Sequence, residues 1–81
     1  MKKKEFDYIV QFVIDSLVGF LMEDYQLPML EAFDKVYHSE TLRKLQDKST
    51  GLYLRSAAYT YEYLKKELQL NDQYKDNRAI N

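Results

Sequence analysis

Hydrophobic residues recur at helical spacing over the first third of the chain, from about Lys4 to Tyr25. One broad apolar face of this run comprises Phe6, Ile9, Val10, Val13, Leu17, Phe20 and Leu21. Three further apolar residues widen that face: Phe12, Ile14 and Val18. Only a narrow stripe through Gln11 and Asp15 stays polar. Steps of three and four residues predict a long amphipathic helix that needs cover over most of its circumference.

Two shorter helices are expected next. Gln26-Leu27-Pro28 ends the first helix, and Pro28 suits the first turn of a second, because its missing N–H group has no partner to lose there. This second helix, about Pro28 to His38, has one apolar side: Met29, Leu30, Ala32, Phe33, Val36 and Tyr37. Ser39 is an expected N-cap for a third helix that extends through Gln46. Its inward residues are Leu42 and Leu45.

A fourth helix is predicted over about Ala57 to Leu70, with Ser56 as its N-cap. Residues 47–51 precede it as a loop, and residues 52–54 fit either an extended or a helical segment. One stripe of the helix faces the expected core: Ala57, Tyr61, Leu64 and Leu68. A second stripe lies on roughly the opposite side: Tyr59, Tyr63 and Leu70. Residues 71–81 are polar and are predicted to form a loose tail.

These elements predict an all-α fold, a small irregular bundle of about four helices with one long N-terminal helix. The 81 residues form one domain, 1–81, with its core at about 5–70. A chain of this size buries only about 60% of its unfolded surface, so small domains often rely on a disulfide, a metal or a partner. Cysteine is absent from the sequence, which leaves association with another protein as the remaining support.

Charge and composition narrow the classes of partner. Twelve basic and thirteen acidic residues give a formal charge of −1, which argues against a nucleic-acid-binding domain. Lys2, Lys3 and Lys4 precede an apolar stretch as in a signal peptide, but acidic residues interrupt that stretch and no cleavage site follows. It is also too short and too polar to span a bilayer. We therefore expect a cytoplasmic protein with no membrane partner.

Candidate catalytic and metal-binding groups are sparse. His38 shares a helix face with Asp34 and Glu31, but there is no second histidine, and this face is the polar side of an amphipathic helix. Ser39 is better used as a cap than as a nucleophile. Two glycines 32 positions apart form no phosphate-binding loop. The sequence predicts no catalytic, cofactor-binding or metal-binding residue, and thus a protein that is not an enzyme.

Two binding functions remain for the surface of this protein: contact with DNA and contact with another protein. The second and third helices, joined at Ser39, have the order of a helix-turn-helix, with Arg43 and Lys44 on the would-be reading helix and the N-terminal lysines as phosphate contacts. A small DNA-binding regulator is therefore the alternative function. A small enzyme is the third, less favoured possibility.

The second stripe of the fourth helix gives the preferred function. Tyrosine offers a large contact area with a hydroxyl for water, which protein interfaces favour. We expect a non-catalytic protein–protein interaction module that self-associates, as a homodimer or homo-oligomer, or masks a cognate partner protein. Its interface residues would be Tyr59, Tyr63 and Leu70, with Tyr53 nearby, and Tyr63→Asp should break association while leaving helix content intact. The competing interpretation is that residues 52–54 or the tail cover this stripe within one chain.

Four phrases of the sequence resemble a family of short, uncharacterised bacterial helical proteins. They are LPMLEAF (27–33), VYHSET (36–41), GLYLRS (51–56) and YEYL (61–64), within a similarity that covers about residues 6–68. The resemblance implies a single helical domain. Some related small families are encoded near toxin-like genes, which implies an antitoxin-like or accessory role. No catalytic or ligand residue comes with the resemblance.

Overall fold

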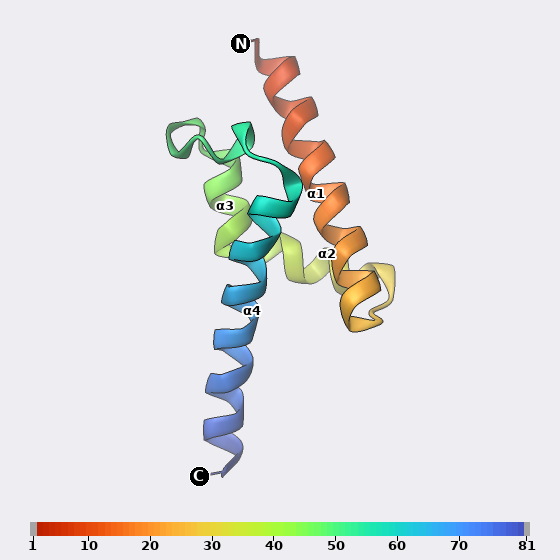
Figure 1. The fold of residues 1–81 in the computed structure, drawn as a ribbon, viewed down its shortest axis with the longest axis vertical. Coiled ribbons are helices and arrows are strands. Elements are labelled where there is room, and N and C mark those ends of the chain that lie inside the picture. Colours follow the sequence, from red (N-terminus) through yellow and green to blue (C-terminus); the bar gives the residue numbers. More distant parts are fainter. Residues whose placement is uncertain (1, 81) are drawn as a thin grey trace.

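Helices make up the fold from end to end. The computed structural model describes the backbone of residues 2–80 and the side chains of residues 2–69. In chain order the elements are α1 (Lys3–Tyr25), α2 (Met29–Tyr37), α3 (Glu40–Gln46), the short 3₁₀ turns η1 (Lys48–Thr50) and η2 (Leu52–Leu54), and α4 (Ala57–Ile80) (Figure 1). The described backbone contains no strand. The predicted all-α bundle with a long N-terminal helix is confirmed.

Helix α1 ends where the sequence predicted. Gln26 takes a left-handed conformation with φ of 57°, and its side-chain amide donates a 2.9 Å hydrogen bond to the carbonyl of Glu23. A left-handed residue turns the chain out of the helix. Pro28 then stands as the N-cap of α2, so the helix begins at Met29, one position after the predicted start, and the Pro28 carbonyl accepts from Ala32 N in the first helical turn. The chain thereby folds α2 back across α1, behind it in Figure 1.

Helix α3 begins at the predicted cap. Ser39 Oγ accepts a 3.1 Å hydrogen bond from Leu42 N and donates a 2.6 Å bond to Val36 O. One buried hydroxyl therefore closes both the end of α2 and the start of α3. Leu42 and Leu45 are buried, as their spacing predicted.

The segment between α3 and α4 is more regular than a loop. Asp47 caps η1 by accepting from Ser49 N at 3.0 Å. A 2.7 Å bond from the Ser49 hydroxyl, and then this backbone bond, lower the pKa of the exposed Asp47 carboxyl. Gly51 ends this turn with φ of 68°, a backbone conformation that glycine adopts without strain. Residues 52–54 form the 3₁₀ turn η2, which settles the open choice for them in favour of a helical segment.

Helix α4 runs in the same direction as α1 and continues beyond its end (Figure 1). Ser56 Oγ accepts from Tyr59 N at 3.1 Å, so the predicted N-cap is confirmed. The helix extends to Ile80 and not only to about Leu70, since nothing in the sequence after Leu70 forces a stop such as proline or glycine. The backbone of residues 71–80, predicted as a loose polar tail, therefore continues α4 as helix, while the side chains of this segment lie outside the described part of the chain.

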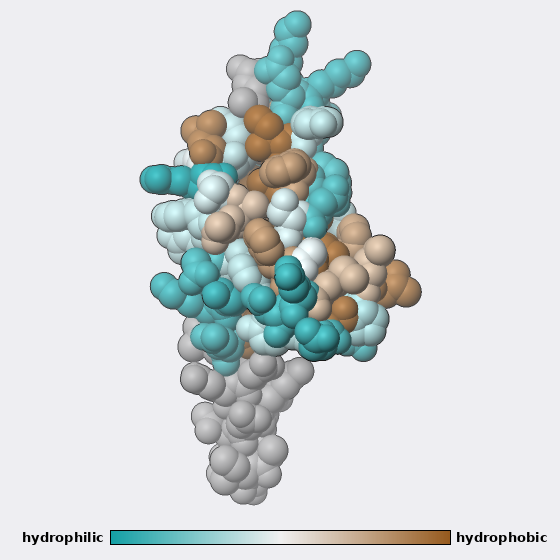
Figure 2. Space-filling view, turned by 45° about the vertical axis from the view of Figure 1, so that its right-hand side comes forward, coloured by the Kyte–Doolittle hydropathy of each residue, from teal (hydrophilic) through white to brown (hydrophobic). Residues whose placement is uncertain are grey.

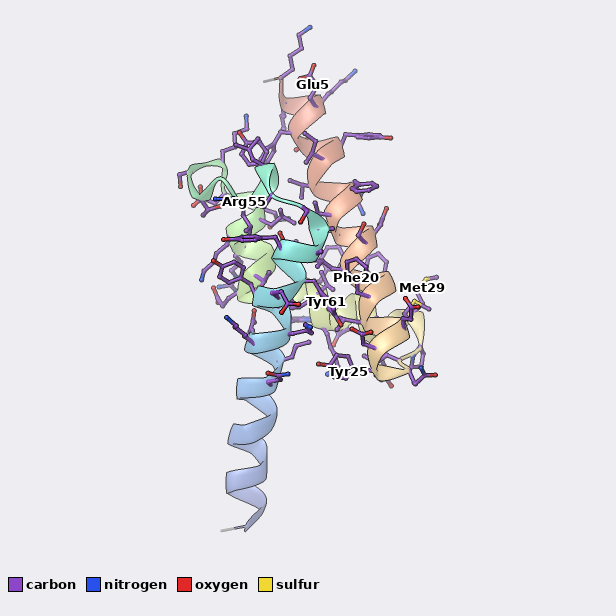
Figure 3. All side chains as sticks on the ribbon, in the orientation of Figure 1. Glu5, Phe20, Tyr25, Met29, Arg55 and Tyr61 are labelled. Carbon is purple, nitrogen blue, oxygen red and sulfur yellow. The ribbon has the colours of Figure 1, made fainter. Side chains whose placement is uncertain are left out.

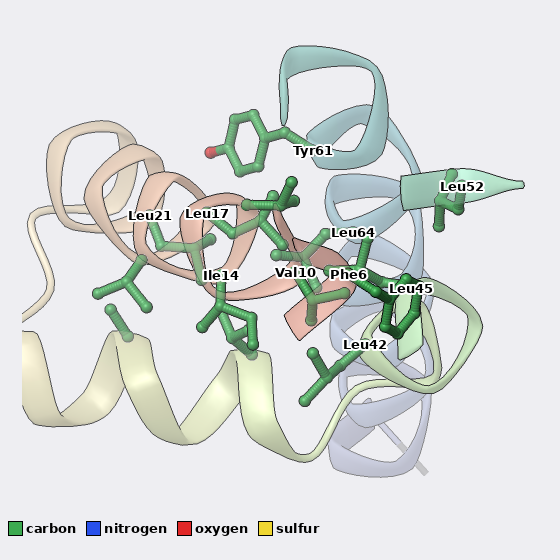
Figure 4. Packing of buried hydrophobic residues seen from close by; sticks show 14 residues of the cluster. Phe6, Val10, Ile14, Leu17, Leu21, Leu42, Leu45, Leu52, Tyr61 and Leu64 are labelled. Carbon is green, nitrogen blue, oxygen red and sulfur yellow. The ribbon is translucent and has the colours of Figure 1, made fainter. Parts of the chain in front are cut away.

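One core joins all the elements. Leu17, Leu21, Leu45, Val36 and Leu64 are fully buried, and together they bring α1 against α2, α3 and α4. Figure 4 shows the α1 side chains pointing between the other helices, with Tyr61 above and Leu42 below. The core stripe predicted for α4 is confirmed, because Tyr61 and Leu64 are buried and Ala57 and Leu68 are half-buried.

Several apolar residues on the predicted faces lie outside this core. Ile14 and Val18, expected only to widen the face of α1, are buried in the core, whereas Phe12 is 63% exposed. On α2, Ala32 and Val36 are buried but Leu30 is 82% exposed. The reason is geometric: α2 has nine residues and packs mainly on α1, and one neighbouring helix covers only part of an apolar arc. Met29 and Tyr37 are exposed for the same reason.

Candidate interaction surface

Tyr59 and Tyr63, hereafter the tyrosine pair, lie one turn apart on the face of α4 that points away from the core. Their hydroxyl oxygens are 3.3 Å apart, and their rings meet edge to face at 5.4 Å between centroids. They remain 41% and 46% exposed. Each tyrosine is thus a little more than half covered by its own chain, and Tyr63 lines a hollow together with Leu52. The interpretation that residues 52–54 or the tail cover this stripe stays open beside the interface interpretation.

Charged groups surround the tyrosine pair. The Arg55 guanidinium lies 5.0 Å from the centroid of the Tyr59 ring, a cation–π contact that holds this ring in place. The hydrogen bond with Tyr63 raises the pKa of Tyr59, because the protonated hydroxyl donates it and ionisation would lose it. A hollow beside the pair is also lined by Glu62 and Lys66. The result is an aromatic centre with a charged rim, the usual anatomy of a protein interface.

Of the other two predicted interface residues, the structure describes the side chain of Tyr53 only. Tyr53 is half-buried in η2, and its ring packs edge to face on Phe6 of α1 with 4.9 Å between centroids. It therefore belongs to the edge of the core, against the expectation that it lies with the tyrosine stripe. The side chain of Leu70 lies outside the described residues, so its place in the interface stays a prediction.

A second exposed aromatic site on α1 was missed by the sequence reasoning. Tyr8 is 77% exposed and Phe12, one turn later, is 63% exposed. Both lie on the side of α1 opposite its buried residues. The four-residue spacing of these two aromatics was a usable signal.

Polar contacts of long sequence separation fix the helices beneath these surfaces. The Glu67 carboxylate of α4 accepts from the backbone N–H groups of Glu40 and Thr41, at 2.9 and 3.1 Å, and from the Thr41 hydroxyl at 2.8 Å. It caps the start of α3. Between α4 and α1, the Tyr61 hydroxyl donates a 2.6 Å bond to Asp24 Oδ2. Figure 3 shows the Tyr61 side chain pointing toward Phe20 on α1.

The residues considered for chemistry form local pairs at the surface. His38 Nδ1 lies 3.1 Å from Asp34 Oδ1 and 2.9 Å from the carbonyl oxygen of the same residue. Arg43 contacts Glu40 at 3.1 Å on α3. Among the described residues there is no group of three or more acidic or histidine side chains placed to hold a metal ion. These pairs have the geometry of exposed intrahelical contacts, which contribute little to stability.

Comparisons of the chain with family models, with curated proteins and with solved structures found no match. The resemblance to short bacterial helical proteins is therefore still an expectation. In the part of the chain that the structure describes, no helix combines the length and the apolar character needed to cross a bilayer.

Proposed function

We propose that the protein is a non-catalytic interaction module of the cytoplasm that self-associates or masks a partner protein. The observation that carries the proposal is the amount of apolar surface left outside the core on three helices. Tyr8 and Phe12 on α1, Leu30 on α2 and the tyrosine pair on α4 are all exposed. A single exposed apolar residue is ordinary, but several on a chain of this size favour contact with another protein.

The tyrosine pair is the surface we assign to a partner protein. Two rings already held by each other and by Arg55 lose little conformational freedom on binding. The charged groups beside them, Glu62 and Lys66, supply a polar rim that discriminates among partners. An antitoxin-like or accessory role, implied by the family resemblance, is one form such masking takes.

A DNA-binding regulator is less well supported by the same geometry. In a helix-turn-helix, the start of the second helix approaches DNA. Here that end of α3 carries the Glu67 carboxylate, which repels phosphate, and Arg43 is paired with Glu40. A gel shift at low salt tests this rival, which predicts binding that depends on the N-terminal lysines and falls steeply with salt.

The test of the proposed function combines mass with capture. Light scattering across a dilution series reports self-association of the whole chain. Tagged wild-type protein, Tyr63→Asp and the matched control Tyr37→Asp, which changes an exposed tyrosine on α2, are then used to capture proteins from a lysate of the native host. We expect a protein that wild type and the control retain and Tyr63→Asp loses, with equal helix content by circular dichroism. A chain that stays monomeric and shows no capture dependent on Tyr63 would overturn the proposal.

A further inference from the structure

The outer face of α1 carries large residues in its first half and small ones in its second. Tyr8, Phe12, Ser16 and Gly19 follow one another at steps of four, four and three residues, so they form a single stripe opposite the buried face. Figure 2 shows apolar residues in several separate patches on this face of the molecule, with hydrophilic residues between them. We call this stripe the outer stripe.

Gly19 has no explanation within its own chain. Glycine in a helix interior is destabilising relative to alanine. A Cβ atom built on Gly19 would meet nothing within 4 Å, and the residue has no positive φ that would call for glycine. Neither a close packing contact nor the backbone conformation therefore requires glycine here. The missing side chain at Gly19 instead leaves room on the helix surface for a large side chain of another protein molecule.

We infer that a second copy of the chain docks antiparallel on the outer stripe, with Tyr8 of each copy over Gly19 of the other and Phe12 over Ser16. This inference deepens the proposed function and rests on it. Along the axis of α1, the point midway between Tyr8 and Gly19 lies only half a residue, about 0.8 Å, from the point midway between Phe12 and Ser16. One twofold axis therefore satisfies both pairings. That axis crosses α1 at its middle, so the two helices overlap over their whole length.

The area available sets the strength of this contact. An aromatic side chain has about 150–250 Å² to bury, so the exposed fractions of Tyr8 and Phe12 leave about 300 Å² of ring surface per copy. The two copies together thus bury about 600 Å² of ring surface, which makes this a weak, reversible contact. We therefore expect a dissociation constant in the micromolar range.

The rim of this arrangement carries a like-charge contact. Glu5 and Glu23 are both exposed on the same flank of the outer stripe, at equal distances from the middle of α1. The twofold axis sets Glu5 of one copy opposite Glu23 of the other, which weakens the dimer. Replacing Glu23 by lysine turns each contact into an attraction, so the arrangement predicts a substitution that strengthens association.

The test measures mass against concentration by sedimentation equilibrium, with circular dichroism as the check on folding. Gly19→Gln fills the small half of the outer stripe without changing charge and places a better helix former in α1. We expect its dimer to dissociate at least about tenfold more readily while the fold is retained or stabilised. Phe12→Gln should act likewise, and Leu30→Gln, which removes an even more exposed apolar side chain from α2, should leave the mass unchanged. Glu23→Lys should tighten the dimer severalfold, and Glu31→Lys on α2 should not.

The outcomes separate this inference from the proposed function. Monomeric Gly19→Gln and Phe12→Gln beside a dimeric Leu30→Gln support the antiparallel contact. A dimer that survives both α1 substitutions overturns the contact but leaves self-association, and with it the proposed function, intact. A wild-type chain that is monomeric at millimolar concentration also overturns the contact, and the proposed function then depends on capture through Tyr63 alone.

Discussion

The buried phenol of Tyr61 makes the stability of the fold dependent on alkaline pH, and Tyr61→Phe should remove that dependence. The hydroxyl donates a 2.6 Å hydrogen bond to the Asp24 carboxylate, and the ring lies 4.9 Å from that of Phe20. Phenylalanine keeps the ring packing and loses only the donor. Because Asp24 is exposed and stays hydrated, we expect a cost of about 1 kcal/mol at pH 7.

The pH dependence follows from the proton on Tyr61. Burial of the ring, and then the neighbouring Asp24 carboxylate, raise the pKa of Tyr61 well above its usual value. The unfolded chain releases this proton near pH 10 while the folded chain retains it, so the unfolded state binds fewer protons above that pH. The contribution of Tyr61 is therefore complete below pH 10 and falls above it by up to about 1.4 kcal/mol per pH unit.

Urea unfolding followed by circular dichroism at pH 7 and pH 11 measures both effects. Between these values wild type should lose about 1.4 kcal/mol more than Tyr61→Phe, because one unit above pH 10 corresponds to nearly one full proton. The order of stability should then reverse, with Tyr61→Phe more stable than wild type by about 0.4 kcal/mol at pH 11. Tyr37→Phe, an exposed phenol on α2, is the control and should follow wild type. A difference between wild type and Tyr61→Phe that stays constant from pH 7 to pH 11 would refute the reasoning.

Three further substitutions test individual contacts by urea unfolding of dilute protein. Glu67→Gln should lower the free energy of unfolding by about 1 kcal/mol, because a neutral amide replaces the carboxylate that caps α3. The control Glu62→Gln on the same helix should change it by less than about 0.5 kcal/mol. Equal effects of the two substitutions would contradict the role of the cap. Gly19→Ala should raise it by about 0.5–1 kcal/mol, since the added methyl group meets open space, and a loss would show a contact within the chain. Thr60→Val should raise it by about 1 kcal/mol, because the buried Thr60 hydroxyl has no hydrogen-bond partner among the described residues, and a loss would reveal one.

What the sequence predicted well is local. Ser39 and Ser56 were identified as caps because a hydroxyl before an apolar periodic run satisfies N–H groups within the next three residues. Pro28 predicted the start of α2, and the spacing of Leu42 and Leu45 predicted the buried side of α3. Each of these features depends on residues a few positions apart, so periodicity and capping rules were sufficient.

What it could not predict depends on residues far apart in the chain. Glu67 reaches the start of α3 across 26 and 27 positions, and Tyr61 reaches Asp24 across 37. No local pattern carries such pairings, since they arise only once the helices have packed. The exposure of Phe12 and Leu30 is of the same kind. Their spacing is that of core residues, and only the number of neighbouring helices decides that they stay outside.

The placement of every other element on one side of α1 connects the fold to the proposed association. Helices α2, α3 and α4 all pack on the side of α1 that contains Leu17, and the chain supplies no described element to cover the outer stripe. Folding and association therefore make opposite demands at Gly19: a side chain there favours the isolated helix, whereas its absence makes room for a second copy. If Gly19 served only the fold of its own chain, a single substitution there would not raise the free energy of unfolding and weaken the dimer together. Gly19→Gln should do so, with a higher free energy of unfolding and a weaker dimer in the same protein.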